Sequence, residues 1–385
     1  MKLIYDKNII RKNNEALLLQ NIINEKEVSR SDLAELTSLN KASVSAIVTT
    51  LIEKSLIFES HIGESSYSGG RRPVYLKFNP EAGSIISIDI GTDYINTLLT
   101  TLNGKIIKNI KYENISICTD TIVERLVSII TKYLKQQPKT PHNIVGIGVA
   151  VHGVVLNNNI RFTPNYSLDQ INIHEELAKY FKIPIYIENE ANLGALGEFV
   201  FSSPFNSLIN INIHSGVGAG IIFSDKILNG NRGYTGEIGH SILFPNGRNC
   251  PCGNKGCLER YISEEATVKD VQKKLNNYSL NIDDVIYYAN NSNKIVLTIL
   301  KEKAEYLSIG INNLISFYDP EIIIINSKIY NRIPQLINTI KQQLNSRVSR
   351  KTNIRNTNLN GNSTLYGCIA LVLQNFLKID QIKFD

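Results

Sequence analysis

The chain has 385 residues, enough for two or three domains, and its 43% hydrophobic and 20% charged residues describe an ordinary soluble globular protein. No apolar run approaches the roughly 18 residues that a membrane-spanning helix needs, and the charged N-terminal segment lacks the core of a signal peptide. We therefore expect a cytoplasmic protein with no membrane partner. The net charge of +6 is too mild to predict nucleic-acid binding by itself.

Helical patterns dominate the start of residues 1–79. Apolar residues at helical spacing predict a first helix over 13–25. Ser29 with Asp32 forms a capping-box pattern that opens a short second helix. The polar segment 37–40 then ends that helix.

A third helix is expected over 41–54, with Asn40 as its N-cap. Two short helices joined by a tight turn predict a helix-turn-helix, whose second helix enters the major groove of DNA. Small polar side chains on its outer face can reach bases or phosphates, although an idle helix face is the alternative for any single residue. The candidate DNA contacts on this face are Lys41, Ser43, Ser45 and, more weakly, Thr49.

Two expected strands, 56–61 and 73–78, flank a Gly/Ser-rich tip and complete a winged helix. Arg71 and Arg72 follow the tip and are candidates for phosphate or minor-groove contact. The alternative for the whole unit is a helical protein-interaction module.

Strands and helices alternate after a short linker at 79–83, which predicts an α/β body with parallel or mixed sheets. The expected strands are 84–91, 94–101, 144–151, 183–187, 207–213, 221–223 and 322–325. The expected helices are roughly 121–136, 173–180, 192–199, 264–275 and 296–316.

Four soft ligands lie within a short stretch of this body: His240, Cys250, Cys252 and Cys257. One imidazole and three thiolates suit a tetrahedral, structural Zn²⁺, and the glycines between the cysteines let the loop turn tightly. The alternative is a disulfide or unpaired thiols. Glu237 and Glu259 flank the ligands, and together with the second nitrogen of His240 they can hydrogen-bond a polyhydroxylated ligand. Either glutamate alone can equally be a solvated surface charge.

The pattern E-x-G-H followed by C-x-C-G-x-x-G-C-x-E, over residues 237–259, resembles the signature of the ROK family of repressors and sugar kinases. The Gly-Gly-Arg-Arg-Pro run at 69–73 resembles the segment between wing and body in the repressor branch. The resemblance implies a winged helix over 1–79 and an actin-like, two-lobed sugar-binding body over 80–385. Its second lobe would span roughly 190–360 and hold the zinc site at 240–257.

The same resemblance implies the sugar ligands. In family kinases an aspartate deprotonates the sugar hydroxyl that attacks ATP, and Glu190 stands at that position here. Asn189 matches a ligand of a sugar hydroxyl, and Asn165 lies in a turn that resembles a sugar contact. A glutamate is longer by one methylene, which argues against in-line phosphoryl transfer without excluding sugar binding.

Two of three nucleotide-binding elements differ from the family kinases. Those kinases carry D-x-G-G-T-K after the first strand, whereas residues 89–94 read Asp-Ile-Gly-Thr-Asp-Tyr. Residues 326–328 replace a Gly-Gly turn against adenosine, and only the weak G-x-G-x-G pattern at 216–220 is kept. We therefore expect no use of ATP as a cofactor and no enzyme activity.

These features predict a sugar-responsive repressor that binds operator DNA as a homodimer or homotetramer, with D-xylose as the favoured effector. Three alternatives stay open. They are a sugar kinase with an accessory DNA-binding domain, a regulator that responds to an amino-sugar phosphate, and a scaffold protein in which zinc has only a structural role. The sequence leaves open the effector, the operator and the direction of the response.

Overall fold

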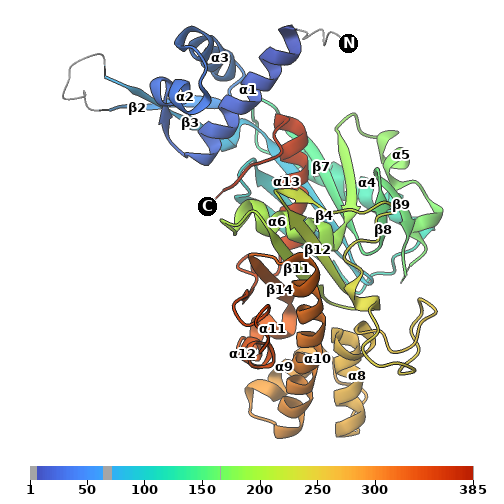
Figure 1. Ribbon diagram of the computed structural model, residues 1–385. Coiled ribbons are helices and arrows are strands. Elements are labelled where there is room, and N and C mark those ends of the chain that lie inside the picture. The colour runs from blue at the N-terminus through green and yellow to red at the C-terminus, as the bar shows by residue number, and fades with distance from the viewer. Residues whose placement is uncertain (1–6, 64–71, 165, 385) are drawn as a thin grey trace.

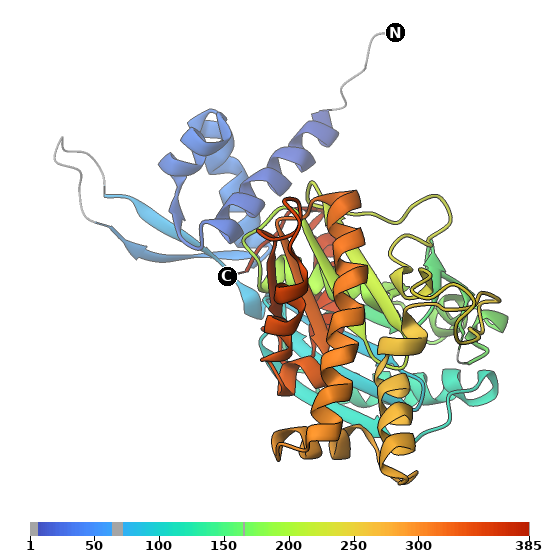
Figure 2. The same cartoon turned by 60° about the horizontal axis from the view of Figure 1, so that its bottom comes forward.

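Residues 7–63, 72–164 and 166–384 are described by the computed structural model of the chain (Figure 1). Its N-terminal unit consists of α1 (Lys7–Asn24), β1 (Val28–Ser29), α2 (Arg30–Thr37), α3 (Lys41–Glu53), β2 (Ile57–Ile62) and β3 (Val74–Phe78). The sheet has the order β1-β3-β2, and β2 and β3 point away from the rest of the molecule in Figures 1 and 2. This arrangement is a winged helix and confirms the predicted fold, although α1 begins earlier than expected.

Side-chain caps fix the start of α2 and the turn between α2 and α3. Ser29 Oγ accepts a hydrogen bond from Asp32 N at 3.3 Å, and Asp32 Oδ2 accepts one from Ser29 N at 3.0 Å. Ser38 ends α2 in the left-handed conformation, at φ 56°. Asn40 Oδ1 then accepts from Ser43 N at 2.8 Å and starts α3. The caps read from the sequence are therefore confirmed.

The body begins with a five-stranded sheet of order β10-β7-β4-β5-β6. The elements of this lobe are β4 (Ser84–Ile90), β5 (Tyr94–Thr101), β6 (Ile106–Glu113), α4 (Thr119–Gln136), β7 (Ile144–Val151), β8 (Val154–Leu156), β9 (Asn159–Phe162), α5 (Ile173–Ala178) and β10 (Ile185–Asn189), with 3-10 turns at Pro80–Ala82 and Leu168–Gln170. Strands β4, β7 and β10 run parallel, while β5 and β6 form antiparallel pairs at one edge.

A second five-stranded sheet follows, in the order β13-β12-β11-β14-β15. Its lobe contains β11 (Leu208–Ile213), β12 (Val217–Phe223), β13 (Lys226–Ile227), a 3-10 turn at Ile238–His240, α7 (Glu259–Ile262), α8 (Glu264–Leu275), α9 (Ile282–Asn290), α10 (Lys294–Tyr318), β14 (Ile322–Ser327), α11 (Lys328–Arg332), α12 (Leu336–Gln343) and β15 (Asn353–Asn356). Three strands are again parallel and two antiparallel. The two lobes thus repeat one topology, although no repeat is visible in the sequence.

Two helices connect the lobes: α6 (Glu190–Phe201) and α13 (Ser363–Leu377). They pack against each other, with α13 also on β4 and β7 and α6 on β11 and β12. Gly197 permits this close packing, since a methyl group there would lie 2.1 Å from Ser363 O. The two-lobed, actin-like architecture is confirmed. No helix within the described residues is long and apolar enough to cross a membrane.

One hydrophobic core joins the winged helix to the body. It contains Leu18, Ile22 and Leu56 of the winged helix together with Leu373 and Leu377 of α13. Ile379 and Ile382, which follow α13, are buried in the same core. The winged helix is therefore packed on the end of an interlobe helix.

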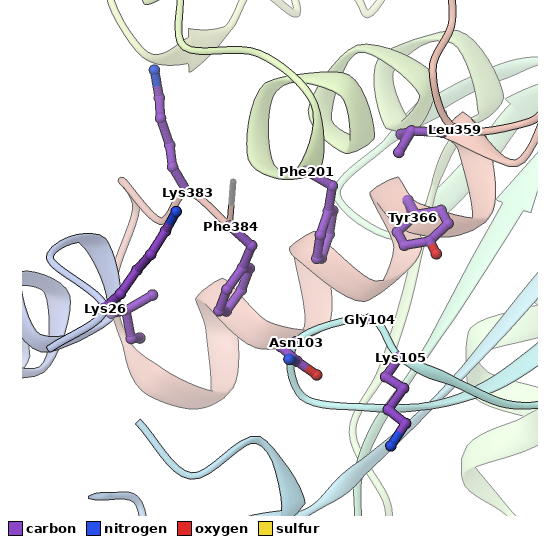
Figure 3. Close-up of a pocket in the computed structure, with 10 residues that line it drawn as sticks. Lys26, Asn103, Gly104, Lys105, Phe201, Leu359, Tyr366, Lys383 and Phe384 are labelled. Atoms are coloured by element: carbon purple, nitrogen blue, oxygen red, sulfur yellow. The ribbon is translucent and has the colours of Figure 1, made fainter. Parts of the chain in front are cut away.

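Aromatic side chains extend this junction along α13 (Figure 3). The ring of Phe201 stacks on Phe384 at 5.5 Å and meets the edge of Tyr366 at 5.0 Å, measured between ring centres. They border a pocket of about 480 Å³, with Lys26 of the winged helix on one side and Lys105 on the other.

Substitution of Leu373 by alanine tests this shared core. Leu373 is fully buried, so we expect Leu373→Ala to lower the free energy of unfolding by about 2–5 kcal/mol, measured by urea denaturation. Ile106→Ala, at a strand residue that is 42% exposed, should change it by less than about 0.5 kcal/mol. Equal midpoints for the two variants would contradict the assignment of this core.

Candidate functional site

Four side chains form a candidate metal centre in the loop after β13. The ligand atoms of His240, Cys250, Cys252 and Cys257 all lie within 4.8 Å of one another. Cys250 and Cys257 are buried, and the cysteines are free thiols. The predicted cluster is confirmed as a group that can hold a metal ion.

Glycines with positive φ close this loop, as the sequence indicated. Gly253 has φ 95° and Gly256 has φ 78°. A methyl group at Gly256 would lie only 1.7 Å from the carbonyl oxygen of Phe244. A side chain at this position would therefore break the loop that carries the thiols.

The two nitrogens of His240 face different partners. Its Nδ1 lies 3.7 Å from Cys250 Sγ, inside the metal cluster. Its Nε2 lies 3.8 Å from Glu237 Oε2. An ion bound through Nδ1 would leave a proton on Nε2, directed toward the carboxylate side of the site.

Three carboxylates gather beside His240. Glu259 Oε2 accepts a hydrogen bond from Val217 N at 3.3 Å, so the start of β12 holds it in place. Glu237 interacts electrostatically with both His240 and Glu259, and burial followed by the charge of Glu259 raises its pKa, against the opposing effect of His240. Glu190 lies against the same strand, because a methyl group at Gly218 would be 3.7 Å from Glu190 Oε1.

Glu190 carries an oxygen that the described residues leave without a partner. Its Oε2 atom is fully buried and makes no hydrogen bond among them. Burial raises the pKa of this carboxyl to about 7; His152 opposes the rise, and the charges of Glu237 and Asp89 add to it. A buried acceptor without a donor is costly, so the geometry favours a ligand that donates a hydrogen bond here.

Asn189 is held mainly by the backbone. Its Oδ1 caps α6 by accepting from Ala191 N at 2.8 Å and Asn192 N at 3.0 Å. Its Nδ2 donates to Gly153 O at 2.7 Å. One N–H of the amide is left for the predicted contact with a sugar hydroxyl.

A buried unit of three side chains, here called the partition, adjoins Glu190: Asp89, Tyr94 and His152. Tyr94 donates its hydroxyl hydrogen to Asp89 Oδ2 at 3.1 Å, and His152 Nε2 lies 3.3 Å from Asp89 Oδ1. Although burial lowers the pKa of His152, Glu190 and Asp89 outweigh it and raise the pKa to about 9. His152 is therefore an imidazolium at neutral pH. The sequence analysis missed its role, and its place directly after β7 was the available signal.

A cavity of about 1020 Å³ lies between the lobes. The partition residues line it, together with residues from both lobes such as Lys328 and Thr364. Its lining holds three Lys or Arg side chains and five Asp or Glu side chains. With the imidazolium of His152 counted, the cavity is polar and nearly balanced in charge.

The candidate DNA contacts lie on the outer face of α3. Lys41, Ser45 and Thr49 are exposed and Ser43 is half-buried. Ala42 and Ala46 are exposed on the same face, a pair of methyl groups that the sequence analysis did not single out. Arg72 is exposed beside β3. Two other predicted residues, Arg71 and Asn165, lie outside the described part of the chain.

The body has the two-lobed fold of sugar kinases, with a Cys₃His cluster beside interlobe carboxylates. The added winged helix is typical of a transcriptional regulator. The chain belongs to the ROK family, whose model matches residues 85–375. It is 36% identical over 383 residues to the xylose repressor of Bacillus spizizenii, an alignment that covers 98% of this chain and 99% of that protein.

Solved structures share the fold. A ROK family transcriptional regulator described as a homolog of the Escherichia coli MLC protein superposes with a TM-score of 0.79 at 24% identity, covering 96% of this chain and 98% of that one. A ROK family glucokinase from Streptomyces griseus, solved with glucose and AMPPNP, superposes with a TM-score of 0.68 at 21% identity, covering 75% and 99%. The glucokinase match spans three quarters of this chain, while the regulator match spans nearly all of it.

The raised pKa of His152 predicts a pH dependence of stability. An unfolded imidazole titrates near 6.5 and the folded one near 9, so the folded state holds the proton more tightly. The stabilisation is complete below pH 6.5 and is lost as the pH rises through 9. We expect the free energy of unfolding to fall over this range in the wild type and to fall less in His152→Gln, measured by urea denaturation at each pH. His174→Gln, at a half-buried histidine of α5, should keep the wild-type slope. A wild-type slope in His152→Gln would refute the charge assignment.

Proposed function

We propose that this chain is a sugar-responsive transcriptional repressor. The winged helix binds operator DNA, and a sugar that binds beside Glu190 releases it. The observation that carries the proposal is α13: its first turn touches Glu190, with Thr364 Oγ1 donating to Glu190 O at 3.3 Å, and its last turn is buried in the core of the winged helix. The xylose repressor relative, similar over nearly the full chain, supports D-xylose as the effector.

The DNA-binding surface is proposed to be the exposed face of α3 and the wing. Lys41 and the hydroxyls of Ser43, Ser45 and Thr49 meet bases and phosphates, while Arg71 and Arg72 meet the backbone or the minor groove. Thr49 contributes least, because its hydroxyl already donates to Ser45 O at 3.0 Å.

The sugar site is proposed to lie between the partition and the metal cluster. Glu190, Glu237 and Glu259 accept hydrogen bonds from hydroxyls, and His240 donates through Nε2. Asn189 contributes its remaining N–H, and Asn165, which lies outside the described residues, is a further proposed contact. A ring of hydroxyls matches such a set of acceptors and donors, whereas an apolar ligand would leave them unpaired.

The proposed function involves no ATP turnover. The ring of Tyr94 covers Gly91 so closely that a methyl group there would lie 2.1 Å from it, and this is the backbone that would face a phosphate. Asp93, which lines the interlobe cavity, adds a negative charge where a triphosphate would lie. Both features argue against the alternative of a sugar kinase with an accessory DNA-binding domain.

Release of DNA requires that the sugar bind more tightly to a conformation in which the spacing of the winged helices does not match the operator. A dimer or tetramer must present two reading helices about 34 Å or a multiple apart, so a small rotation of each suffices. A hundredfold loss of DNA affinity needs about 2.7 kcal/mol of preference for that conformation. α13 is the element through which the movement would pass.

Selection of binding sites from random duplex DNA, followed by fluorescence anisotropy on the selected duplex, tests this function. We expect D-xylose to lower the DNA affinity of the wild type by tenfold or more. Glu190→Gln should bind DNA normally and respond much less to xylose, since it loses a charged acceptor but keeps its shape. A response to an amino-sugar phosphate alone would favour that alternative effector. Phosphorylation of any sugar at enzymatic rates, or DNA binding that no sugar alters, would overturn the proposal.

We further propose that the Cys₃His cluster holds a structural Zn²⁺. Three thiolates and one imidazole fill all four positions of a tetrahedral ion, which leaves no open position for water. When bound, the ion supplies a fixed scaffold for the loop. His240 and Glu259 are then held toward the carboxylates of the sugar site.

Replacement of one thiol tests the metal proposal. Cys252→Ser should lower the zinc content of the purified protein well below one ion per chain, measured by atomic absorption. It should weaken xylose binding and leave the α-helical circular dichroism unchanged. The reason is that the loop carrying the metal ligands lies outside the hydrophobic cores beside the two sheets. Cys118→Ser, at a cysteine outside the cluster, is the matched control and should retain zinc. Full zinc occupancy in Cys252→Ser would rule out this ligand set.

A further inference from the structure

The loop of residues 240–257, here called the cluster loop, is tied to the rest of its lobe through Arg248. The backbone N–H of Arg248 donates to Tyr261 Oη at 2.8 Å, and its carbonyl oxygen accepts from Gly256 N at 2.8 Å. Gly256 directly precedes the last thiol of the cluster, and Arg248 is two positions before the first. A displacement of Arg248 therefore moves the backbone that carries both thiols.

The side chain of Arg248 binds two helices at once. Its Nη1 donates to Arg260 O at 2.8 Å, and its Nη2 donates to Asp270 Oδ1 at 2.9 Å and to Oδ2 at 3.1 Å. The guanidinium also lies over the ring of Tyr261, 4.7 Å from the ring centre. Arg260 and Tyr261 belong to α7, and Asp270 belongs to α8. The cluster loop is therefore bound to both helices through one planar group with several donors.

Asp270 is held in place from its other side. Lys303 of α10 forms an ion pair with its carboxylate, and the Lys303 side chain is only 6% exposed. Separating a buried ammonium from its counter-ion is strongly destabilising, so this pair keeps Asp270 in position. The carboxylate that Arg248 binds is thus a fixed point between α8 and α10.

Aromatic packing holds the cluster loop at the same place. Phe244 makes edge-to-face contacts with Tyr261 at 4.9 Å and with Tyr306 of α10 at 5.2 Å, between ring centres. The backbone approaches α7 so closely that a methyl group at Gly247 would lie 2.2 Å from Tyr261 Oη. None of these contacts uses the side chain of a metal ligand, so they are available with and without a bound ion.

We propose that Arg248 is a positioning residue for the Cys₃His cluster: it holds the cluster loop on α7 and α8, so that the ligand atoms are gathered before an ion binds. This inference rests on the proposed zinc site. A preformed site does not have to order its loop on binding, which increases its affinity for the ion. Because Arg248 also binds the carbonyl oxygen of Arg260, it fixes the start of the helix that presents Glu259 to the proposed sugar site.

The role of Arg248 differs from that of an ordinary surface ion pair. Its side chain is 44% exposed, and an isolated pair at such a position contributes little to the stability of a fold. Its two backbone and three side-chain hydrogen bonds instead restrict the positions that the cluster loop can adopt. We therefore expect a substitution of Arg248 to change zinc affinity more than it changes the free energy of unfolding.

Competition for zinc with a series of chelators of graded affinity tests this inference on the full-length protein. Arg248→Met keeps an unbranched apolar side chain and removes the donors, and it should raise the Kd for zinc by about tenfold or more. Asp270 keeps Lys303 as its counter-ion in this variant, so the fold should be retained. The matched control is Arg30→Met in the winged helix. Arg30 binds Glu59 at 2.9 Å in a similar ion pair, and its loss should leave the Kd for zinc unchanged.

The outcomes separate this inference from the proposed zinc site. A wild type that binds no zinc overturns the zinc site itself. A wild type that binds zinc while Arg248→Met has the same Kd overturns the positioning role alone, even if the urea midpoint of the variant falls, since that result shows a purely structural contact. If Arg248→Met loses the wild-type circular dichroism spectrum, Arg248→Gln replaces it, because it keeps one amide donor. A wild-type Kd in that folded variant overturns the inference equally.

Discussion

The burial of α13 in two places at once is the constraint on which the rest of the molecule depends. Its first turn lies between the lobes and its last turn lies in the hydrophobic core that the body shares with the winged helix. A helix is stiff along its axis, so a displacement at one end is carried to the other. Without this packing, the winged helix and the body would be independent domains joined by a linker. Ligand binding at the proposed sugar site would then have no physical means of changing the proposed DNA-binding surface.

Charge balance at the lobe interface is the second constraint. Burial and the charges of Glu237 and Asp89 raise the pKa of Glu190, and burial raises the pKa of Glu237. His152 is the buried cation among them. The protein itself thus supplies a positive charge among these carboxylates. This explains how the acidic side chains can remain together in the interior.

The sequence allowed the prediction of features whose chemistry is local. The capping residues Ser29 and Asn40 each depend on a few neighbouring positions. The Cys₃His cluster likewise lies within one short stretch of the sequence. Helix α13 was missed because its residues are apolar on nearly all sides, so its sequence lacks the periodicity that marks a surface helix. Its buried position between the lobes is the reason for that composition.

The candidate site was only partly predictable for a different reason. Glu190, Glu237 and His240 were found because they belong to a known family pattern. His152 was missed because its importance depends on Asp89 and Glu190, which lie 63 and 38 positions away and meet it only in the folded chain. Asn189 differs in the opposite sense. The family pattern marks it as a ligand, but its side-chain oxygen accepts the two hydrogen bonds that cap α6.

The packing of residues 379–384 against the winged helix has a consequence for biosynthesis. Lys383 N donates to Asn24 Oδ1 at 3.3 Å across 359 positions of sequence, and the neighbouring isoleucines fill the same core. At ordinary elongation rates, a ribosome needs on the order of 20 to 70 seconds to travel that distance. The winged helix is synthesised before these residues and lacks part of its hydrophobic core until they are added. A product of interrupted translation would therefore carry a less stable winged helix.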